Sequence, residues 1–300
     1  MLPVAGRSAV TGVERRTTVV RLEAGPVEYR LEQRGEAAVV VFHGGHMRAG
    51  LALGEEVFAE AGYTLLVPSR PGYGRTPLST GTTVSGFADA TRELCDHLGI
   101  SKIAAVVGIS GGGPTAVTMA ARHPDLVARL ILQSAVGWLT WPDRRTRLAA
   151  HAMFAAATER ATWAAVRALM RLAPDAGLRM LLCDLSTRPV RDVMTVLSTE
   201  DRATLIALFS HMRSGSGFLN DLRPSPDVTA DVGQPTVVIA TPRDGAVPFA
   251  HAQSLTTAIR RAELVGSQAD SHFIWLGPDW PAIAEEIRDF LNGPVKSTGR

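Results

Sequence analysis

The sequence predicts an α/β fold: a mostly parallel β-sheet flanked by helices, with a helical cap inserted near the middle of the chain. Two observations lead to this class. Short β-branched and apolar runs alternate with helical stretches through residues 1–135, as in strand–helix–strand units. Helical spacing alone fills residues 136–222, and the alternation returns over residues 223–300. We therefore predict a core in two parts, 1–135 and 223–300, with 136–222 as the cap between them.

The first part of the core contains six runs that we expect to be strands. The run at Ala37–Phe42 is apolar without interruption, as a strand covered on both faces must be. Two earlier runs flank Gly25, which favours an antiparallel hairpin. The six runs are Thr17–Leu22, Val27–Leu31, Ala37–Phe42, Thr64–Val67, Ile103–Val107 and Leu130–Gln133.

Helices are expected between these strands because glycine or proline marks where each one ends. The stretch Leu51–Ala61 closes at Gly62, and Thr83–Leu98 closes at Gly99. A third stretch, Pro114–Arg122, stops before a His-Pro pair. The second part of the core repeats the pattern with two strands and two helices, at Thr236–Ala240, Phe249–Ile259, Ala262–Val265 and Trp280–Leu291.

The composition excludes several classes of protein. Of the 300 residues, 46% are hydrophobic and 20% are charged, which suits a packed globular chain. The formal net charge of +2 and the absence of a dense basic run argue against a dedicated nucleic-acid binder. The two cysteines, Cys95 and Cys183, are too few for a disulfide framework or a cysteine-based zinc site. We expect no metal and no cofactor, and the oligomeric state, monomer or homodimer, stays open.

The sequence gives no sign of a membrane segment. The most apolar helix-like stretch, His151–Met170, is interrupted by charged residues. No stretch of the sequence approaches the 18 uncharged apolar residues that a membrane span needs. Met1–Arg16 lacks the apolar segment of a secretory signal. We expect a cytoplasmic protein.

The central motif is Gly108-Ile109-Ser110-Gly111-Gly112, which fits the Gly-x-Ser-x-Gly pattern. It lies between a predicted strand and a predicted helix, as that pattern requires. The chain must reverse sharply there to project the Ser110 hydroxyl at the sheet edge, and the flanking glycines leave room for the turn. A phosphate-binding loop is the competing interpretation, but no Gly-Lys-Ser/Thr follows the glycines.

A serine needs a base and a group that orients the base before it becomes a good nucleophile. In this motif the expected chain order is serine, acid, histidine. Asp244 and His272 each follow a predicted strand of the second core part, so we expect both at the carboxyl edge of the sheet. The rivals are weaker: Asp270 lies too close to His272 in the chain to orient it, and His251 falls within a predicted helix.

Two backbone N–H groups should stabilise an oxyanion beside the serine. One belongs to Gly111, the residue after the nucleophile. The other should come from the loop after Ala37–Phe42, where we choose Gly45, with His46 as second choice. A metal site on His43 and His46 is the alternative, but it lacks a third ligand at sensible spacing.

Five sequence blocks occur in order along the chain: His43-Gly44-Gly45, Ser69–Thr76, Gly108-x-Ser110-x-Gly112, Asp244-x-x-Val247-Pro248 and Ser271-His272-Phe273. With these blocks the chain resembles the α/β-hydrolase fold superfamily, in particular its single-cap serine hydrolase branch. The resemblance extends over roughly 27–291. The second block departs from the family pattern, because Ser69 stands where the family usually has Asp, at a structural turn.

The resemblance implies a serine hydrolase that cleaves a carboxylic ester of small to medium size through an acyl-enzyme, with Ser110, Asp244 and His272 as triad. Ser110 argues against epoxide hydrolases and haloalkane dehalogenases, which use an Asp nucleophile. A lactonase or a carbon–carbon bond hydrolase of the same fold stays open. So does a different class, a hydrolase-fold receptor or scaffold that binds a ligand with little turnover.

Three further residues are candidates for substrate contact. His46 belongs to the oxyanion loop, and Arg48 lies beside it as a possible partner of a substrate carboxylate. Trp138 opens an apolar stripe through the predicted cap. Most of that stripe should pack the cap itself, and a few members should face a small-molecule substrate, because such pockets are mainly apolar.

Overall fold

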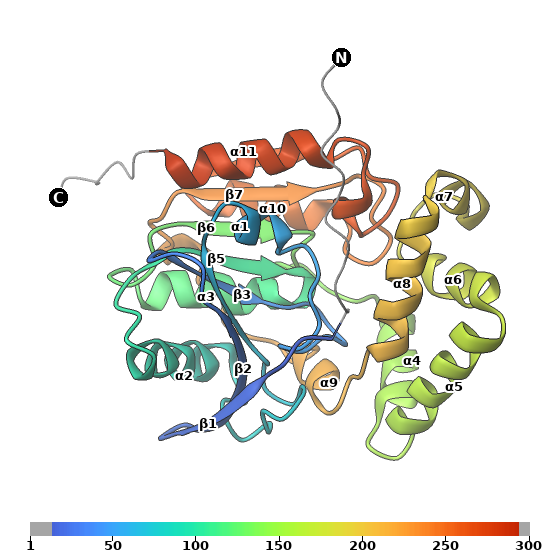
Figure 1. The fold of residues 1–300 in the computed structure, drawn as a ribbon, viewed down its shortest axis with the longest axis horizontal. Coiled ribbons are helices and arrows are strands. Elements are labelled where there is room, and N and C mark those ends of the chain that lie inside the picture. The colour runs from blue at the N-terminus through green and yellow to red at the C-terminus, as the bar shows by residue number, and fades with distance from the viewer. Residues whose placement is uncertain (1–13, 294–300) are drawn as a thin grey trace.

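An eight-stranded sheet runs through the centre of the computed structural model, which describes residues 14–293 (Figure 1). Its strand order is β1-β2-β4-β3-β5-β6-β7-β8. The first two strands form an antiparallel hairpin, β2 pairs antiparallel with β4, and every other neighbouring pair is parallel. The strands are β1 (Thr18–Leu22), β2 (Gly25–Glu32), β3 (Ala38–Phe42), β4 (Thr64–Pro68), β5 (Ile103–Ile109), β6 (Leu130–Gln133), β7 (Thr236–Ala240) and β8 (Ala262–Gly266).

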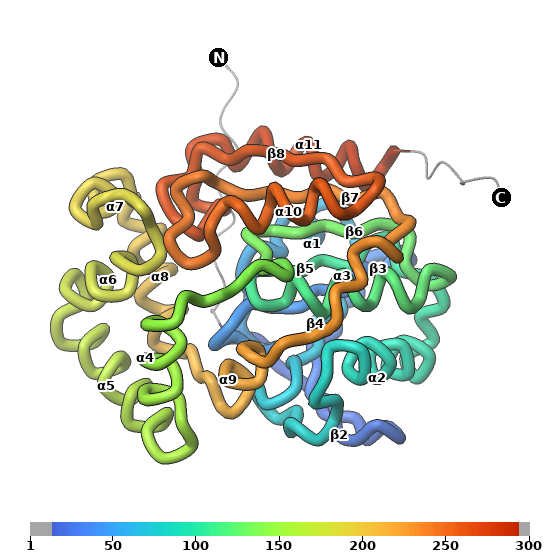
Figure 2. Tube along the Cα trace, turned by 180° about the vertical axis from the view of Figure 1, so that it is seen from behind, coloured from blue at the N-terminus to red at the C-terminus, as the bar shows by residue number. Residues whose placement is uncertain are grey.

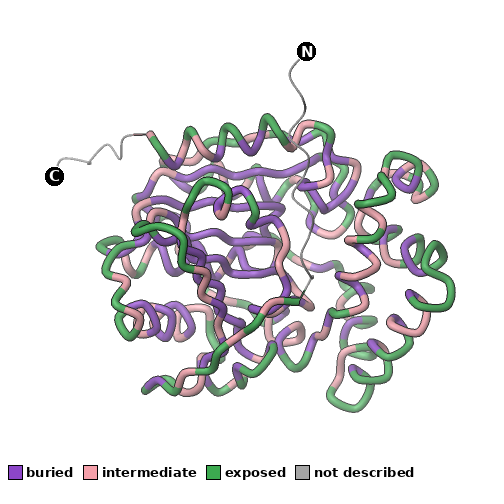
Figure 3. The backbone as a smooth tube through the Cα atoms, viewed as in Figure 1, coloured by how far each residue is buried: buried purple, intermediate pink, exposed green. Residues whose placement is uncertain are grey.

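Helices cover both faces of the sheet, and Figure 2 shows the face with α2 (Val84–His97), α3 (Gly113–Arg122) and α10 (Ala250–Ala258). The opposite face carries α1 (Glu56–Glu60) and α11 (Trp280–Asn292). Strand β3 sends alternate side chains into the two hydrophobic clusters and is buried along its whole length. The central strands are accordingly the buried layer in Figure 3. The predicted fold class is confirmed.

Between β6 and β7, a stretch that the structure describes throughout, the chain forms six α-helices, one 3₁₀ turn and no strand. Five of them form a layer beside the sheet edge in Figure 1, and the last, α9, returns toward the core. They are α4 (Arg144–Phe154), α5 (Glu159–Leu172), α6 (Pro174–Leu182), α7 (Val190–Val196), α8 (Thr199–His211) and α9 (Gly217–Asp221).

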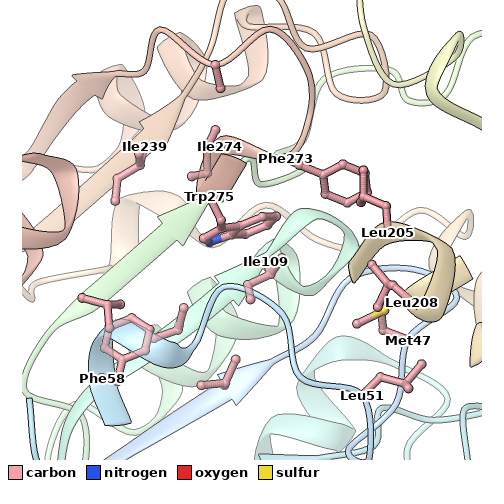
Figure 4. Close-up of a cluster of buried hydrophobic side chains, with 14 of the residues drawn as sticks. Met47, Leu51, Phe58, Ile109, Leu205, Leu208, Ile239, Phe273, Ile274 and Trp275 are labelled. Carbon is pink, nitrogen blue, oxygen red and sulfur yellow. The ribbon is translucent and has the colours of Figure 1, made fainter. Parts of the chain in front are cut away.

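One hydrophobic cluster continues from the sheet into this helical layer. Leu205 and Leu208 of α8 belong to the same cluster as Met47 and Phe273 of the core, as Figure 4 shows. The ring of Phe209, also from α8, lies 6.0 Å from that of Phe273. Apolar side chains therefore pack the helical layer on the core, in addition to the covalent connections at its two ends.

The predicted helix over Leu51–Ala61 is wrong in its first half, because α1 begins only at Glu56. Gly54 has φ 71° and lies against the Trp275 indole, which a Cβ at this position would meet at 2.1 Å. Glu55 is buried in an ion pair with Arg30. These tertiary contacts hold the segment before α1 in a non-helical loop.

The other predicted strands and helices of the core are present within two residues at each end. The termini 1–13 and 294–300, with most of the segment searched for a secretory signal, lie outside the described residues. Within residues 14–293, no helix combines the length and hydropathy that crossing a membrane requires.

Candidate active site

The turn after β5 holds Ser110 at φ 50°, in the left-handed region that a residue with a side chain rarely adopts. Glycines surround it because there is no space for side chains. A Cβ on Gly108 would lie 2.7 Å from the Ala116 Cβ, and one on Gly112 would lie 2.1 Å from the Phe42 carbonyl oxygen. The turn therefore presses the end of β5 and the start of α3 against β3, with Ser110 at its apex.

His272 and Asp244 lie together at the same edge of the sheet. The His272 Nδ1 is 2.6 Å from the Asp244 Oδ2, and both side chains are buried. The other carboxylate oxygen of Asp244 accepts the backbone N–H groups of Ala246 and Val247 at 2.8 and 2.9 Å. The Asp244 carboxylate therefore accepts a hydrogen bond from the protonated Nδ1 of His272. This leaves the Nε2 of His272 as the basic nitrogen.

A short segment after β6 connects the serine turn with the histidine loop. The Ser134 hydroxyl donates to the His272 carbonyl oxygen at 3.0 Å, and the Val136 N–H donates to the Ser110 carbonyl oxygen at 2.9 Å. Within the described chain Ser110 Oγ makes no hydrogen bond, and such catalytic contacts are often long in a free enzyme. Sequence reasoning missed Ser134, which has φ 47° and no motif around it.

The structure separates the rival residues from this arrangement. Asp270 forms ion pairs with Arg188 and Arg243 at 2.9 and 2.7 Å. The Nδ1 of His251 accepts the N–H of Gly137 at 3.0 Å, and burial lowers the pKa of His251. Neither residue contacts Ser110 or His272 through a hydrogen bond.

The loop after β3 runs directly over the serine turn. A Cβ on Gly111 would lie 3.5 Å from the backbone nitrogen of Gly45, and one on Gly44 would lie 3.2 Å from the Ser110 Cβ. The two N–H groups predicted as oxyanion donors, those of Gly45 and Gly111, are thus neighbours. Such proximity is one condition for two N–H groups to serve the same oxygen, and their role as oxyanion donors stays a prediction.

His43 holds this loop as a neutral imidazole. Its Nε2 accepts the Arg70 backbone N–H at 3.0 Å, so its Nδ1 carries the proton and donates to the Gly44 carbonyl oxygen at 2.8 Å. Burial, reinforced by the Arg70 charge, holds the pKa of His43 well below its usual value. Among residues 14–293, no three His, Cys, Asp or Glu side chains are grouped as metal ligands would be.

His46 lies in contact with the cap. Its Nδ1 is 2.8 Å from the Ser214 hydroxyl oxygen, and its ring centroid is 4.0 Å from that of Phe218. Phe154 and Trp163 approach the same ring at 4.7 and 5.2 Å. Burial lowers the pKa of His46 to about 3, so the imidazole is neutral at physiological pH.

The two other candidates for substrate contact have partners elsewhere. Arg48 donates to the His211 carbonyl oxygen and pairs with Glu14. Trp138 donates its indole N–H to the Ser225 carbonyl oxygen at 3.1 Å and packs against the cluster under α2, α3 and α10. The structure does not bring either side chain together with the triad.

Several residues near the oxyanion loop carried no signal in the sequence. Phe218 and Asp221 of α9 lie against Gly45 and Gly111, where a Cβ would meet them at 3.0 and 3.3 Å. Asp221 pairs with Arg70, which stood inside a motif block but was treated as part of a turn. Only the three-dimensional return of the cap toward the core reveals these contacts.

The cap also supports the loops that carry Asp244 and His272. The His272 N–H donates to the Leu185 carbonyl oxygen at 2.7 Å, and the Thr187 N–H donates to that of Arg243 at 2.9 Å. Between them, Ser186 forms an isolated β-bridge with Asp244. The loop between α6 and α7 therefore fixes both halves of the Asp–His pair.

The site combines a strained serine turn, a buried Asp–His pair and a glycine loop, all at the carboxyl edge of a parallel sheet. This combination is typical of α/β hydrolases. A family model described as alpha/beta hydrolase fold matches residues 37–276, and the chain belongs to this family.

Three relatives illustrate the match. The uncharacterized hydrolase YcgS of Bacillus subtilis (strain 168) is 32% identical over 285 residues, which are 93% of this chain and 99% of that protein. An alpha/beta hydrolase fold protein from Nakamurella multipartita has a TM-score of 0.78 at 24% identity, covering 92% and 99% of the two chains. A 2-hydroxy-6-oxononadienedioate/2-hydroxy-6-oxononatrienedioate hydrolase from Pseudomonas sp. is 33% identical over 103 residues, 33% of this chain and 36% of that one. The chain is thus placed among the hydrolases of this fold.

Proposed function

We propose that the protein is a serine hydrolase of carboxylic esters of small to medium size, with Ser110, Asp244 and His272 as its triad. The observation that carries this proposal is the buried hydrogen bond of 2.6 Å between Asp244 and His272, at the sheet edge where Ser110 is held in a left-handed turn. The acid orients the base, and the turn presents the nucleophile.

The reaction follows from these positions. The His272 Nε2 takes the Ser110 hydroxyl proton while Oγ attacks the ester carbonyl carbon, and the carbonyl π electrons move to oxygen. The N–H groups of Gly45 and Gly111 stabilise that oxyanion. When the tetrahedral intermediate collapses, the C–O bond to the alcohol breaks and His272 gives the alcohol its proton. Water then attacks the acyl-enzyme by the same sequence, and the acid is released.

The cap residues near the donors favour an uncharged, compact acyl group. Phe218 lies against Gly45, and His46 is a neutral ring among aromatic side chains. Arg48, the candidate for binding a carboxylate, already has an acidic partner in Glu14. Apolar walls with few polar groups are the usual lining of such sites.

A carbon–carbon bond hydrolase is the second candidate. The partial match to the Pseudomonas enzyme favours it, over 103 residues and one third of the chain. The same triad and oxyanion hole would act on a ketone carbonyl, with a carbon leaving group in place of the alcohol. Product analysis on a vinylogous diketone separates this reaction, and ring-opened product separates a lactonase.

The test is hydrolysis of p-nitrophenyl esters from acetate to decanoate, with wild type, Ser110→Ala and the exposed-site control Ser101→Ala measured together. We expect turnover of short esters, a loss of about 10⁴-fold in Ser110→Ala and no loss in the control. A fluorophosphonate probe should label both wild type and the Ser101→Ala control, and leave Ser110→Ala unlabelled. Absence of both turnover and labelling in wild type would contradict the proposal and favour a ligand-binding role.

A further inference from the structure

A buried ion pair joins the returning cap segment to the core beside the oxyanion loop. Arg70, from the loop after β4, donates two parallel hydrogen bonds to the Asp221 carboxylate, at 2.6 and 2.8 Å. The Tyr73 hydroxyl donates to the same carboxylate at 2.6 Å. The Arg70 side chain is 3% exposed and that of Asp221 is 10% exposed, so little solvent screens either charge.

The two charges lie within contact distance of a proposed oxyanion donor. A Cβ on Gly111 would lie 3.3 Å from the Asp221 Oδ2 and 3.4 Å from an Arg70 guanidinium nitrogen. An unpaired carboxylate at this place would oppose the negative charge that develops on the substrate oxygen. Arg70 cancels the Asp221 charge through a bidentate contact, the strongest geometry for such a pair.

The same arginine also binds the backbone of the oxyanion loop. Its Nε donates to the His43 carbonyl oxygen at 2.8 Å, and its guanidinium lies over the Tyr73 ring, 5.0 Å from the centroid. On the cap side, Asp221 ends the short helix α9 that carries Phe218 against Gly45. One ion pair thus connects the donor loop, the serine turn and the segment that covers them.

We propose that Arg70 is a positioning and charge-balancing residue of the oxyanion hole, with Asp221 as the anchor that the cap supplies. Asp221 fastens α9 beside Gly111, and Arg70 removes the electrostatic cost of placing a carboxylate there. This role rests on the proposed attack of Ser110 on a substrate carbonyl, because that attack is the step that builds an oxyanion between Gly45 and Gly111.

The charge hypothesis makes a prediction that a purely structural role does not make. Arg70→Met leaves the Asp221 carboxylate without its cation, so kcat should fall about 100-fold with little change in KM, since the loss falls on the transition state. The double variant Arg70→Met/Asp221→Asn has even fewer native contacts, but it leaves no charge at either position. Its kcat should therefore be at least about tenfold higher than that of Arg70→Met. Asp221→Asn alone should lower kcat by less than about tenfold.

The experiment compares these three variants with wild type on the best p-nitrophenyl ester. The rate of fluorophosphonate labelling of Ser110 serves as a second readout, and thermal unfolding shows that each variant is folded. Arg70→Lys keeps the charge without the bidentate contact, so its kcat should exceed that of Arg70→Met. This variant keeps the hypothesis testable if Arg70→Met does not fold, because Arg70→Lys should then still exceed one tenth of the wild-type kcat.

Arg75→Met is the matched control. Arg75 lies five residues further along the same loop and pairs with another buried carboxylate, that of Glu28, at 2.9 Å. Its loss should leave kcat unchanged. A double variant no faster than Arg70→Met, or an Arg70→Met enzyme as fast as wild type, would overturn the proposal. An inactive, unlabelled wild type would instead contradict the proposed function itself.

Discussion

At the edge of the sheet, Ser110, Asp244 and His272 follow strands of the parallel core, whereas the groups that cover them come from the helical insertion between β6 and β7. The strands before Ser110 and Asp244, β5 and β7, are buried along almost their whole length and pair with β6 between them. The strand before His272, β8, is the edge strand and is half-buried to exposed. The cap keeps large apolar side chains in solvent, among them Leu148, Leu172 and Val196. Ser110 and Asp244, two of the three proposed catalytic residues, thus follow the more constrained strands of the molecule.

The cap nevertheless touches the site at fixed points rather than only lying over it. The Leu185 carbonyl accepts the His272 N–H, and the N–H of Ser216 and of Gly217 donate to the Gly72 carbonyl at 3.2 Å. Asp221 adds the ion pair with Arg70. The comparison suggests that the core determines which reaction takes place, while the cap tunes its rate and the size of its substrate.

The largest effect should come from replacing Asp244, the proposed acid, and the nearby Asp270 serves as its control. Asp244→Asn keeps the size of the side chain but favours the wrong tautomer of His272, so kcat/KM for an ester should fall by about 10⁴-fold. Asp270→Asn, two residues before His272, should change it less than threefold, because Asp270 pairs with surface arginines. Equal losses in the two variants would show that Asp244 is not the acid.

The next effect concerns the packing of the serine turn. Gly112→Ala places a Cβ 2.1 Å from the Phe42 carbonyl oxygen, well inside contact distance, so the free energy of unfolding should fall by about 3 kcal/mol. Gly266→Ala at the end of β8 is the control, since a Cβ there meets nothing within 4 Å. Chemical denaturation of both variants measures the difference. Similar stabilities would mean that the turn is looser than its geometry indicates.

The effect that is smallest near neutral pH is a pH dependence where His46 of the core contacts the cap. His46 is neutral in the folded state down to a pKa of about 3, whereas the unfolded chain takes up a proton below about pH 6.5. Unfolding therefore binds a proton in this window, and the folded state loses up to about 1.4 kcal/mol per pH unit as pH falls.

His46→Asn removes that titration and tolerates the left-handed backbone at φ 62°. Its free energy of unfolding should fall less steeply than that of wild type between pH 6 and pH 4, and the two curves should run parallel above pH 7. Urea denaturation across this range gives both slopes. Identical slopes below pH 6 would contradict a neutral, buried His46.

Much of the core followed from local sequence patterns. The alternation of β-branched runs with helices predicts the parallel sheet, and glycines around Ser110 predict the strained turn, because both depend on neighbours in the chain. Asp244 and His272 could be chosen because parallel strands end at one edge. The helix predicted from Leu51 failed where a distant indole, that of Trp275, meets Gly54.

The cap contacts could not be predicted for the same reason. Asp221 meets Arg70 across 151 positions of chain, and nothing near either residue specifies the pairing. Arg48 looked available beside the oxyanion loop, yet its partners are Glu14 and the distant His211. Contacts between residues distant in the chain therefore determine which charged side chains near the site can meet a substrate. These contacts bear on substrate specificity, whereas the local motifs bear on the type of reaction.

The central claim is that hydrolysis passes through an acyl group on Ser110, and one measurement tests it most directly. Wild type is mixed with p-nitrophenyl butyrate, quenched with acid before the first turnover is complete, and examined by intact mass and peptide mapping. We predict a single butyryl group on the peptide that contains Ser110, and none in Ser110→Ala. Ester consumption with no acyl-enzyme at any quench time, or with the acyl group on another residue, would contradict the account.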